Sequence, residues 1–336
     1  MSRLPKRGPT LQDVAKAAGV SPATASHAIR KKTPVSPEVQ ERVRVAIEQL
    51  GYQPLAHKEP KRGRRAILVL IKKNPTEYWQ RCIMGLTLDA REAGYDVLVG
   101  DLRQLNAEEY FRSLGGRKVY GVVVFGAAAT DEQIAQAMEC LPVVTLDRSA
   151  PGCGSVLSGR ENGMRRLVRR LAASGYRNLG FLGADPSFRY DESLHQAFCR
   201  GLEESRLDLH PRWVHVTRML RHNRADMAYE LIQGEVAAGR GLPHVYVCAD
   251  DQIAAGAMRA IREYGREIPR ETGIVGFGNA PFSPYLYQPL TTVDADAEGL
   301  GSACFESIRQ QIVEPDQTPQ QLLLDTTLIV RSSVRL

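Results

Sequence analysis

The 336-residue sequence has no apolar stretch long enough to cross a membrane. Its longest run of apolar residues and glycine, residues 119–129, is far shorter than a membrane-spanning helix, which needs about 20 residues. The first ten residues, MSRLPKRGPT, also lack the apolar core of a secretory signal peptide. We therefore expect a cytoplasmic protein with no membrane partner.

Cysteines are few and scattered along the chain. None of the six forms a Cys-x-x-Cys pair, and none lies at metal-ligand spacing from a histidine. This pattern favours reduced, mostly buried thiols over a disulfide framework or a zinc site. We expect no metal site and no cofactor.

Motifs of the common enzyme classes are missing as well. The sequence has neither Gly-x-Ser-x-Gly nor His-Glu-x-x-His, and the glycine-rich residues 154–161 lack the lysine and Ser/Thr of a phosphate-binding loop. Residues 276–278 lack the third glycine of a dinucleotide site. Asp250 and Asp251 are adjacent, and adjacent side chains of an extended chain point in opposite directions, which argues against a shared catalytic proton. We predict that the protein is not an enzyme.

Positive charge, by contrast, is concentrated at one end of the chain. Residues 1–65 contain 14 lysines and arginines against 5 acidic residues, a net charge of +9. Because the whole chain carries +6, the remaining residues carry −3. A basic head on a mildly acidic body is expected when one module contacts a polyanion such as DNA.

The basic segment has the pattern of three short helices. The first begins at Thr10, presents its apolar residues on one face, and ends at Gly19. The second opens at Ser21, which proline follows, and the third runs from Ser36 to Gly51. The pattern predicts an all-α helix-turn-helix head over residues 1–53, a linker over 54–65 and a body over 66–336.

Two stretches of the head, TLQDVAKAAGVSPATASHAI and VSPEVQERVRVAIEQLGYQP, resemble the DNA-binding headpiece of the LacI/GalR family of transcriptional regulators, the lactose-repressor type. The resemblance implies a homodimer on double-stranded operator DNA, with the second helix in the major groove. The residues predicted to contact DNA are Thr10, Ser21, Pro22, Ala23, Thr24, Ser26, His27, Arg30, Ser36, Tyr52 and Leu55.

Three positions of the head and linker depart from the family pattern. His27 stands where the family often has an arginine that reads guanine, so the operator sequence is not transferable from relatives. In the linker, the position of the leucine that wedges into the minor groove is taken by Lys61, and Pro60 would interrupt a hinge helix. Leu55 is then the apolar wedge, or the basic linker follows the phosphates without kinking DNA.

The body alternates short apolar runs with helical stretches, which is typical of parallel sheets covered by helices on both faces. The apolar runs are residues 66–71, 96–99, 119–125, 143–146, 179–182, 245–248 and 274–277. The family resemblance continues through VYVCADDQIAAGAMRAIREYGREIPRETGIVGFG and PLTTV. It implies a two-lobed α/β body like the periplasmic binding proteins, with an N-lobe of about 66–160 plus 293–325 and a C-lobe of about 161–290 plus 326–336.

A small-molecule effector, a sugar or sugar derivative, is implied between the lobes. Asp251 and then Asp147 are the strongest candidates, since a carboxylate accepts hydrogen bonds from two hydroxyls of a polyol. The aromatic pair Tyr78 and Trp79 either stacks on a sugar or belongs to the core. Lys73 either binds an anionic effector or is solvated. The candidate effector-binding residues are Asp251, Asp147, Tyr78, Trp79, Arg189 and Lys73.

The family's effector-binding arginine is missing, because Leu194 occupies its position. Either Arg189 reaches in from the preceding loop, or the effector differs in chemistry. Three hypotheses follow from these patterns. The first is a ligand-gated repressor, the second a constitutive DNA-binding regulator whose ligand cleft is degenerate, and the third a solute-binding or enzymatic body.

Overall fold

The computed structural model describes the chain outside residues 1–10, 23, 26–27, 29–34, 51–64, 73–75, 102–117, 185–188 and 218–222. The chain divides into two units, Met1–Gly63 and Arg64–Leu336, which are described one at a time. Among the helices in these described ranges, none is long and apolar enough to span a membrane.

The first unit is a small helical bundle. Its helices α1 (Leu11–Ala18) and α3 (Pro37–Leu50) pack together, and residues 22, 24–25 and 28 between them are also helical. Its core is made of the buried side chains Val14, Ala15, Ala18, Ala25, Val43 and Ala46. Gly19 has a φ of +63° in the turn after α1, a conformation that glycine adopts at little cost. The predicted all-α head is confirmed.

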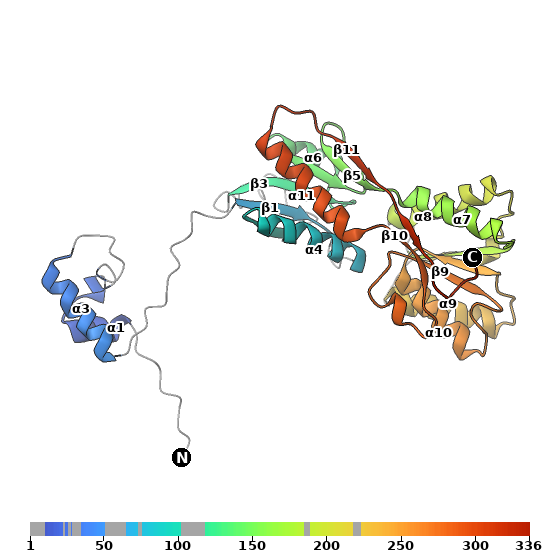
Figure 1. The fold of residues 1–336 in the computed structure, drawn as a ribbon, viewed down its shortest axis with the longest axis horizontal. Helices are drawn as coiled ribbons and strands as arrows, with labels where there is room; N and C mark the ends of the chain where they lie inside the picture. The colour runs from blue at the N-terminus through green and yellow to red at the C-terminus, as the bar shows by residue number, and fades with distance from the viewer. Residues whose placement is uncertain are drawn as a thin grey trace, which may run out of the picture. The chain divides into compact units, whose positions relative to one another are not determined.

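The second unit contains two parallel-rich α/β lobes (Figure 1). In the N-lobe the strand order is β11-β5-β4-β3-β1-β2, and every pairing is parallel. Its elements are β1 (Arg65–Leu70), α4 (Glu77–Glu92), β2 (Tyr95–Gly100), β3 (Val119–Phe125), α6 (Asp131–Met138), β4 (Val143–Leu146), β5 (Gly154–Ser158), α11 (Ala297–Val313) and β11 (Gln321–Leu324).

In the C-lobe the strand order is β12-β10-β9-β8-β6-β7. Its elements are α7 (Arg160–Ala173), β6 (Leu179–Ala184), α8 (Arg189–Glu204), η1 (Pro211–Trp213), β7 (Val214–Thr217), α9 (Arg224–Ala237), β8 (Val245–Cys248), α10 (Asp251–Glu263), β9 (Gly273–Phe277), η2 (Ser283–Tyr285), β10 (Thr291–Asp294) and β12 (Thr327–Ile329). The pairing of β10 with β12 is antiparallel, so this sheet departs at one edge from the all-parallel expectation.

The chain crosses between the lobes at three described places. Gly159 joins β5 to α7, residues 295–296 join β10 to α11, and residues 325–326 join β11 to β12. The final helix of the N-lobe, α11, therefore starts directly at a crossover. Two lobes connected in this way can change their relative orientation through small changes in a few connecting residues.

Helices α4 and α11 approach each other closely in the N-lobe. A Cβ atom added to Gly85 of α4 would lie 2.1 Å from the backbone oxygen of Glu298, and one added to Gly301 of α11 would lie 1.9 Å from that of Cys82. Both contacts are with backbone, which cannot rotate away as a side chain can. The two glycines are therefore required for this helix packing.

We expect Gly85→Ala to destabilise the second unit by about 1–3 kcal/mol, because the methyl group forces the two helices apart. Gly234→Ala in α9 is the matched control, since nothing lies within 4 Å of a Cβ at Gly234. That exchange should stabilise the helix by about 0.5–1 kcal/mol. Thermal denaturation of both variants checks the pair, and equal melting temperatures for the two would contradict the predicted close packing.

Candidate functional site

The described part of the head presents hydroxyl groups at the start of its second helix. The backbone N–H of Thr24 donates to Ser21 Oγ at 3.0 Å, and the two hydroxyl oxygens lie 2.8 Å apart. Ser21 and Pro22 are exposed, and so is Ser36 before α3. A capped helix N-terminus with exposed hydroxyls is suited to binding a phosphate.

Other predicted DNA contacts lie outside the described residues. These are Thr10, Ala23, Ser26, His27, Arg30, Tyr52 and Leu55. The linker residues Pro60 and Lys61 also lie outside them. Their predicted roles stay predictions.

Asp147, at the end of β4, joins three segments of the second unit. Its Oδ1 accepts hydrogen bonds from Ser158 N at 2.9 Å and Ser158 Oγ at 2.6 Å. Its Oδ2 accepts from Tyr78 Oη at 2.7 Å and from Arg160 at 2.9 Å. The Arg160 and Asp147 side chains are 9% and 3% exposed, so this is a buried ion pair. Two predicted effector residues, Asp147 and Tyr78, are thus brought together, but they bind each other.

Trp79 packs within the N-lobe. Its ring centroid lies 4.9 Å from that of Tyr78 and 5.6 Å from that of Phe125, and it also approaches Gly126. Tyr78 is buried and Trp79 is partly buried. The aromatic pair therefore has packing partners within the N-lobe, and its sugar-stacking role stays a prediction.

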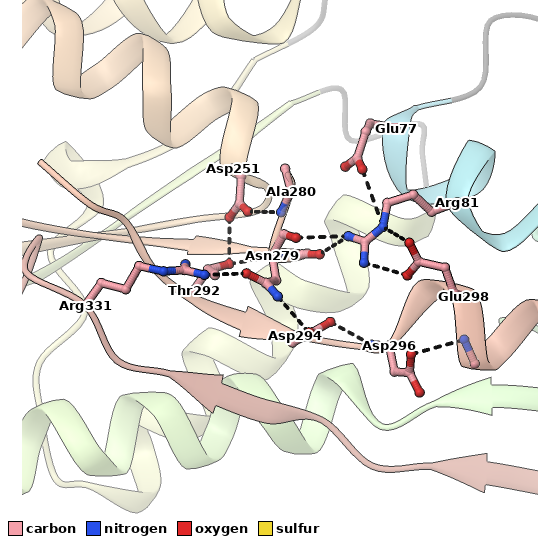
Figure 2. Close-up of polar contacts among 12 residues, drawn as sticks. Glu77, Arg81, Asp251, Asn279, Ala280, Thr292, Asp294, Asp296, Glu298 and Arg331 are labelled. Carbon is pink, nitrogen blue, oxygen red and sulfur yellow. Dashed lines mark hydrogen bonds and ion pairs between the residues drawn. The ribbon is translucent and has the colours of Figure 1, made fainter. Parts of the chain in front are cut away.

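Asp251, the first residue of α10, is 2% exposed and fully engaged within the C-lobe (Figure 2). Its Oδ2 accepts from Ala280 N and Ser283 Oγ, both at 2.6 Å, and its Oδ1 accepts from Thr292 Oγ1 at 2.6 Å. Burial raises the pKa of Asp251, and these hydrogen bonds oppose that rise. The carboxylate therefore ties the loop after β9 to both α10 and β10.

The neighbouring Asp250 has different partners. It caps α10 by accepting from Ile253 N at 2.8 Å, and it forms an ion pair with Arg224 of α9. The two adjacent carboxylates thus serve separate contacts, in line with the expectation that they do not share a proton.

Three further positions were considered for effector binding: Lys73, Arg189 and Leu194. Lys73 and the side chain of Arg189 lie outside the described part of the chain. Leu194 is fully buried in the core of the C-lobe, which accounts for an apolar residue at this position. Among the residues that the structure describes, no cluster of His, Cys, Asp and Glu is arranged to hold a metal ion.

A polar network that the sequence did not predict joins the two lobes (Figure 2). Arg81 of α4 forms two hydrogen bonds with Glu298 of α11, at 2.7 and 2.6 Å, and donates to the backbone oxygens of Gly278 and Asn279 at 2.8 and 3.0 Å. The Arg81 guanidinium lowers the pKa of Glu298. Burial raises the pKa of Glu77, which pairs with Arg81 at 3.6 Å. No motif marks these residues, since Arg81 occupies an ordinary position on an amphipathic helix.

Comparison with known proteins agrees with this architecture. Residues 10–54 match the model of bacterial regulatory proteins of the lacI family, and residues 168–334 match that of the periplasmic binding protein-like domain. The chain is 29% identical to the HTH-type transcriptional regulator GalR of Lacticaseibacillus casei, over 96% of this chain and 99% of that protein.

Two solved structures share the fold over nearly the whole chain. One is the lac repressor dimer bound to operator and the anti-inducer ONPF, with a TM-score of 0.68, 23% identity, and coverage of 97% of this chain and 99% of that chain. The other is the transcriptional regulator CelR in complex with cellobiose, with a TM-score of 0.68, 22% identity and the same coverage. The head and the two-lobed body therefore occur together, in this order, in proteins of known structure.

Proposed function

This chain belongs to the lacI family of bacterial regulatory proteins, which makes it a DNA-binding transcriptional regulator and not an enzyme, and on that premise we propose that it is a cytoplasmic, homodimeric repressor controlled by a small molecule. The observation that carries the proposal is the exposed, capped start of the second helix in a head whose sequence is strongly basic. Two such heads on one dimer would contact two half-sites of an operator.

For the DNA interface we propose the residues named from the family resemblance, with Ser21, Thr24 and Ser36 on phosphates. Pro22 and Ala23 would offer only apolar contacts to bases, and His27 at most one hydrogen bond when neutral. We therefore expect an operator that differs from those read by an arginine at this position.

For the effector we propose a sugar or sugar derivative bound between the lobes, and cellobiose in the CelR complex supports this ligand class. Asp251, Asp147, Tyr78, Trp79, Arg189 and Lys73 remain the proposed contacts. Both carboxylates already accept hydrogen bonds from within the chain, so a polyol would have to share or displace those donors. The same observation favours the second candidate, a constitutive DNA-binding regulator.

The test begins with selection of binding sites from random duplex DNA by the full-length protein. We expect a two-fold symmetric site, bound about a thousandfold or more tightly than random sequence. Its affinity is then measured with sugars, sugar acids, nucleosides and sugar phosphates, and an effector should change it about 5- to 150-fold. Selection without any enriched site would refute the proposal, while an enriched site that responds to none of these compounds would establish the constitutive regulator.

A further inference from the structure

We propose that Arg81 is a latch between the lobes, which holds them in one relative arrangement without any bound molecule and so sets the operator affinity of the protein in its ligand-free form. The effect of Arg81 on operator affinity rests on the proposed function. Its role in holding the two lobes together rests on geometry alone.

The Arg81 guanidinium forms hydrogen bonds with both lobes. Nε and one terminal nitrogen of Arg81 bind the two carboxylate oxygens of Glu298, so that this side of the guanidinium is fixed to α11 in its own lobe. The other terminal nitrogen donates to Gly278 O and Asn279 O in the C-lobe. These partners are 197 and 198 residues away in the sequence, so the contact is not imposed by chain connection. The Arg81 side chain is 13% exposed, which limits competition from water.

The two carbonyl groups that receive Arg81 are held in place. Asn279 has a φ of +49°, which is uncommon for a residue with a side chain, and Gly278 before it has a φ of +117°, which glycine adopts readily. The Asn279 side chain donates to Asp294 Oδ2 at 2.8 Å and accepts from Arg331 at 2.8 Å. Asp294 ends β10, just before one crossover, and Arg331 follows β12, the strand that begins after another crossover. Arg81 thus binds the backbone where the crossovers are anchored.

The charges around Arg81 explain why its loss should separate the lobes. Burial and, to a smaller extent, the charges of Asp251 and Asp250 of the C-lobe raise the pKa of Glu77 in the N-lobe, although Asp250 is also paired with Arg224. The charge of Asp294 of the C-lobe favours the charged form of Arg81. Arg81 is the cation among them that pairs with both N-lobe carboxylates. Without it, acidic groups of the two lobes repel each other across the same space.

The ion pair of Asp147 with Arg160 also joins the two lobes. Its two partners, however, are only 13 residues apart in the sequence, on either side of the crossover at Gly159. Its partners stay near each other whatever the lobes do. Arg81 joins positions that the chain itself leaves free to separate. Its loss is therefore expected to change the equilibrium between lobe arrangements, and an effector acts on that same equilibrium through its differential affinity.

The test compares three variants of the full-length protein. Arg81→Gln removes the latch, and Arg81→Gln with Glu298→Gln removes it together with the nearest uncompensated carboxylate, so that a folded latch-free protein is obtained even if the single variant is unstable. Arg148→Gln is the matched control. Arg148 is also 13% exposed, donates to the backbone oxygen of Ala129 and pairs with Asp131, but all of these lie in the N-lobe.

Fluorescence energy transfer between dyes at the exposed residues Glu132 of the N-lobe and Glu203 of the C-lobe, in the absence of DNA and ligand, reports the lobe arrangement. We expect a shifted or broadened distance distribution for both Arg81 variants and the wild-type distribution for Arg148→Gln. An unchanged distribution in the folded Arg81 variants would overturn the latch. Because this readout needs no operator, it stands or falls separately from the proposed function.

Operator affinity of the same variants tests the regulatory half. The Arg81 variants should bind the selected operator with an affinity changed at least fivefold, and Arg148→Gln should stay within twofold of wild type. A changed distance between the lobes without any change in operator affinity would overturn the regulatory role of Arg81. It would leave the role of Arg81 in holding the lobes together unaffected.

Discussion

Removal of residues 1–63 is expected to abolish operator-specific binding and to leave a folded two-lobed body. The core of the head is built from residues of the first unit only, and the two cores of the body are built from residues after Gly63. Residues 1–63 carry 12 basic and 5 acidic side chains, a net charge of +7, so the remaining chain carries −1. A body of this charge has no general attraction for phosphate.

Gel-shift titration of the selected operator at two salt concentrations measures the effect, with a non-specific duplex as the control. The full-length protein should bind less tightly at higher salt, because bound phosphates release counterions, whereas the truncated protein should bind neither duplex. Circular dichroism and thermal denaturation verify that the truncated body is folded. Specific binding retained by the truncated protein would show that the head assignment is wrong.

The fold class was predictable from short-range patterns. The sequence predicts a helix between Ser36 and Gly51, and α3 occupies Pro37–Leu50. The apolar runs 245–248 and 274–277 correspond to β8 and β9. Helix caps and apolar strand patterns are properties of neighbouring residues, so they can be read without knowing the tertiary structure.

The antiparallel edge of the C-lobe was not predictable in the same way. Strand β12 has three residues, Thr327–Ile329, too few to show an apolar run or an alternating pattern. Its direction depends on how the chain re-enters the lobe after the crossover at residues 325–326, which no local pattern records. The latch of Arg81 was hidden for a related reason, because two of its partners are backbone carbonyls, which every residue has.

The candidate effector site was predictable only as a set of positions. Asp147 and Asp251 were selected because carboxylates bind polyols, but the donors that occupy them come from distant segments, such as Thr292 for Asp251 and Tyr78 for Asp147. A pair of acidic residues in a sequence does not indicate whether a ligand or the chain itself satisfies them. This ambiguity can be resolved by experiment on Asp251.

Substitution of Asp251 by alanine is expected to destabilise the second unit by about 3–5 kcal/mol, because breaking a buried hydrogen-bond network is among the few single changes that cost this much. Three donors lose their acceptor at once: Ala280 N, Ser283 Oγ and Thr292 Oγ1. Each buried donor left unpaired costs about 1–3 kcal/mol. Thermal or urea denaturation of the ligand-free protein measures the loss.

Asp250→Ala is the neighbouring control. Asp250 caps α10 and pairs with Arg224, but its side chain is more exposed, at 19%, than that of Asp251. Loss of a helix cap costs about 0.5–2 kcal/mol, so this variant should be distinctly more stable than Asp251→Ala. A ligand-free stability that is equal in the two variants would contradict the tethering role of Asp251.

Asp251→Asn separates tethering from effector binding. The amide keeps one acceptor oxygen in nearly the same shape but presents an N–H₂ group to donors on its other side, so we expect an intermediate loss of stability. If Asp251 contacts the effector and does not tether the loop, the asparagine and alanine variants would both keep the wild-type melting temperature without ligand and lose only the ligand-induced shift. Since all three donors to Asp251 lie within 2.6 Å and the group is closed off from solvent, we expect the loss to appear in the ligand-free protein first.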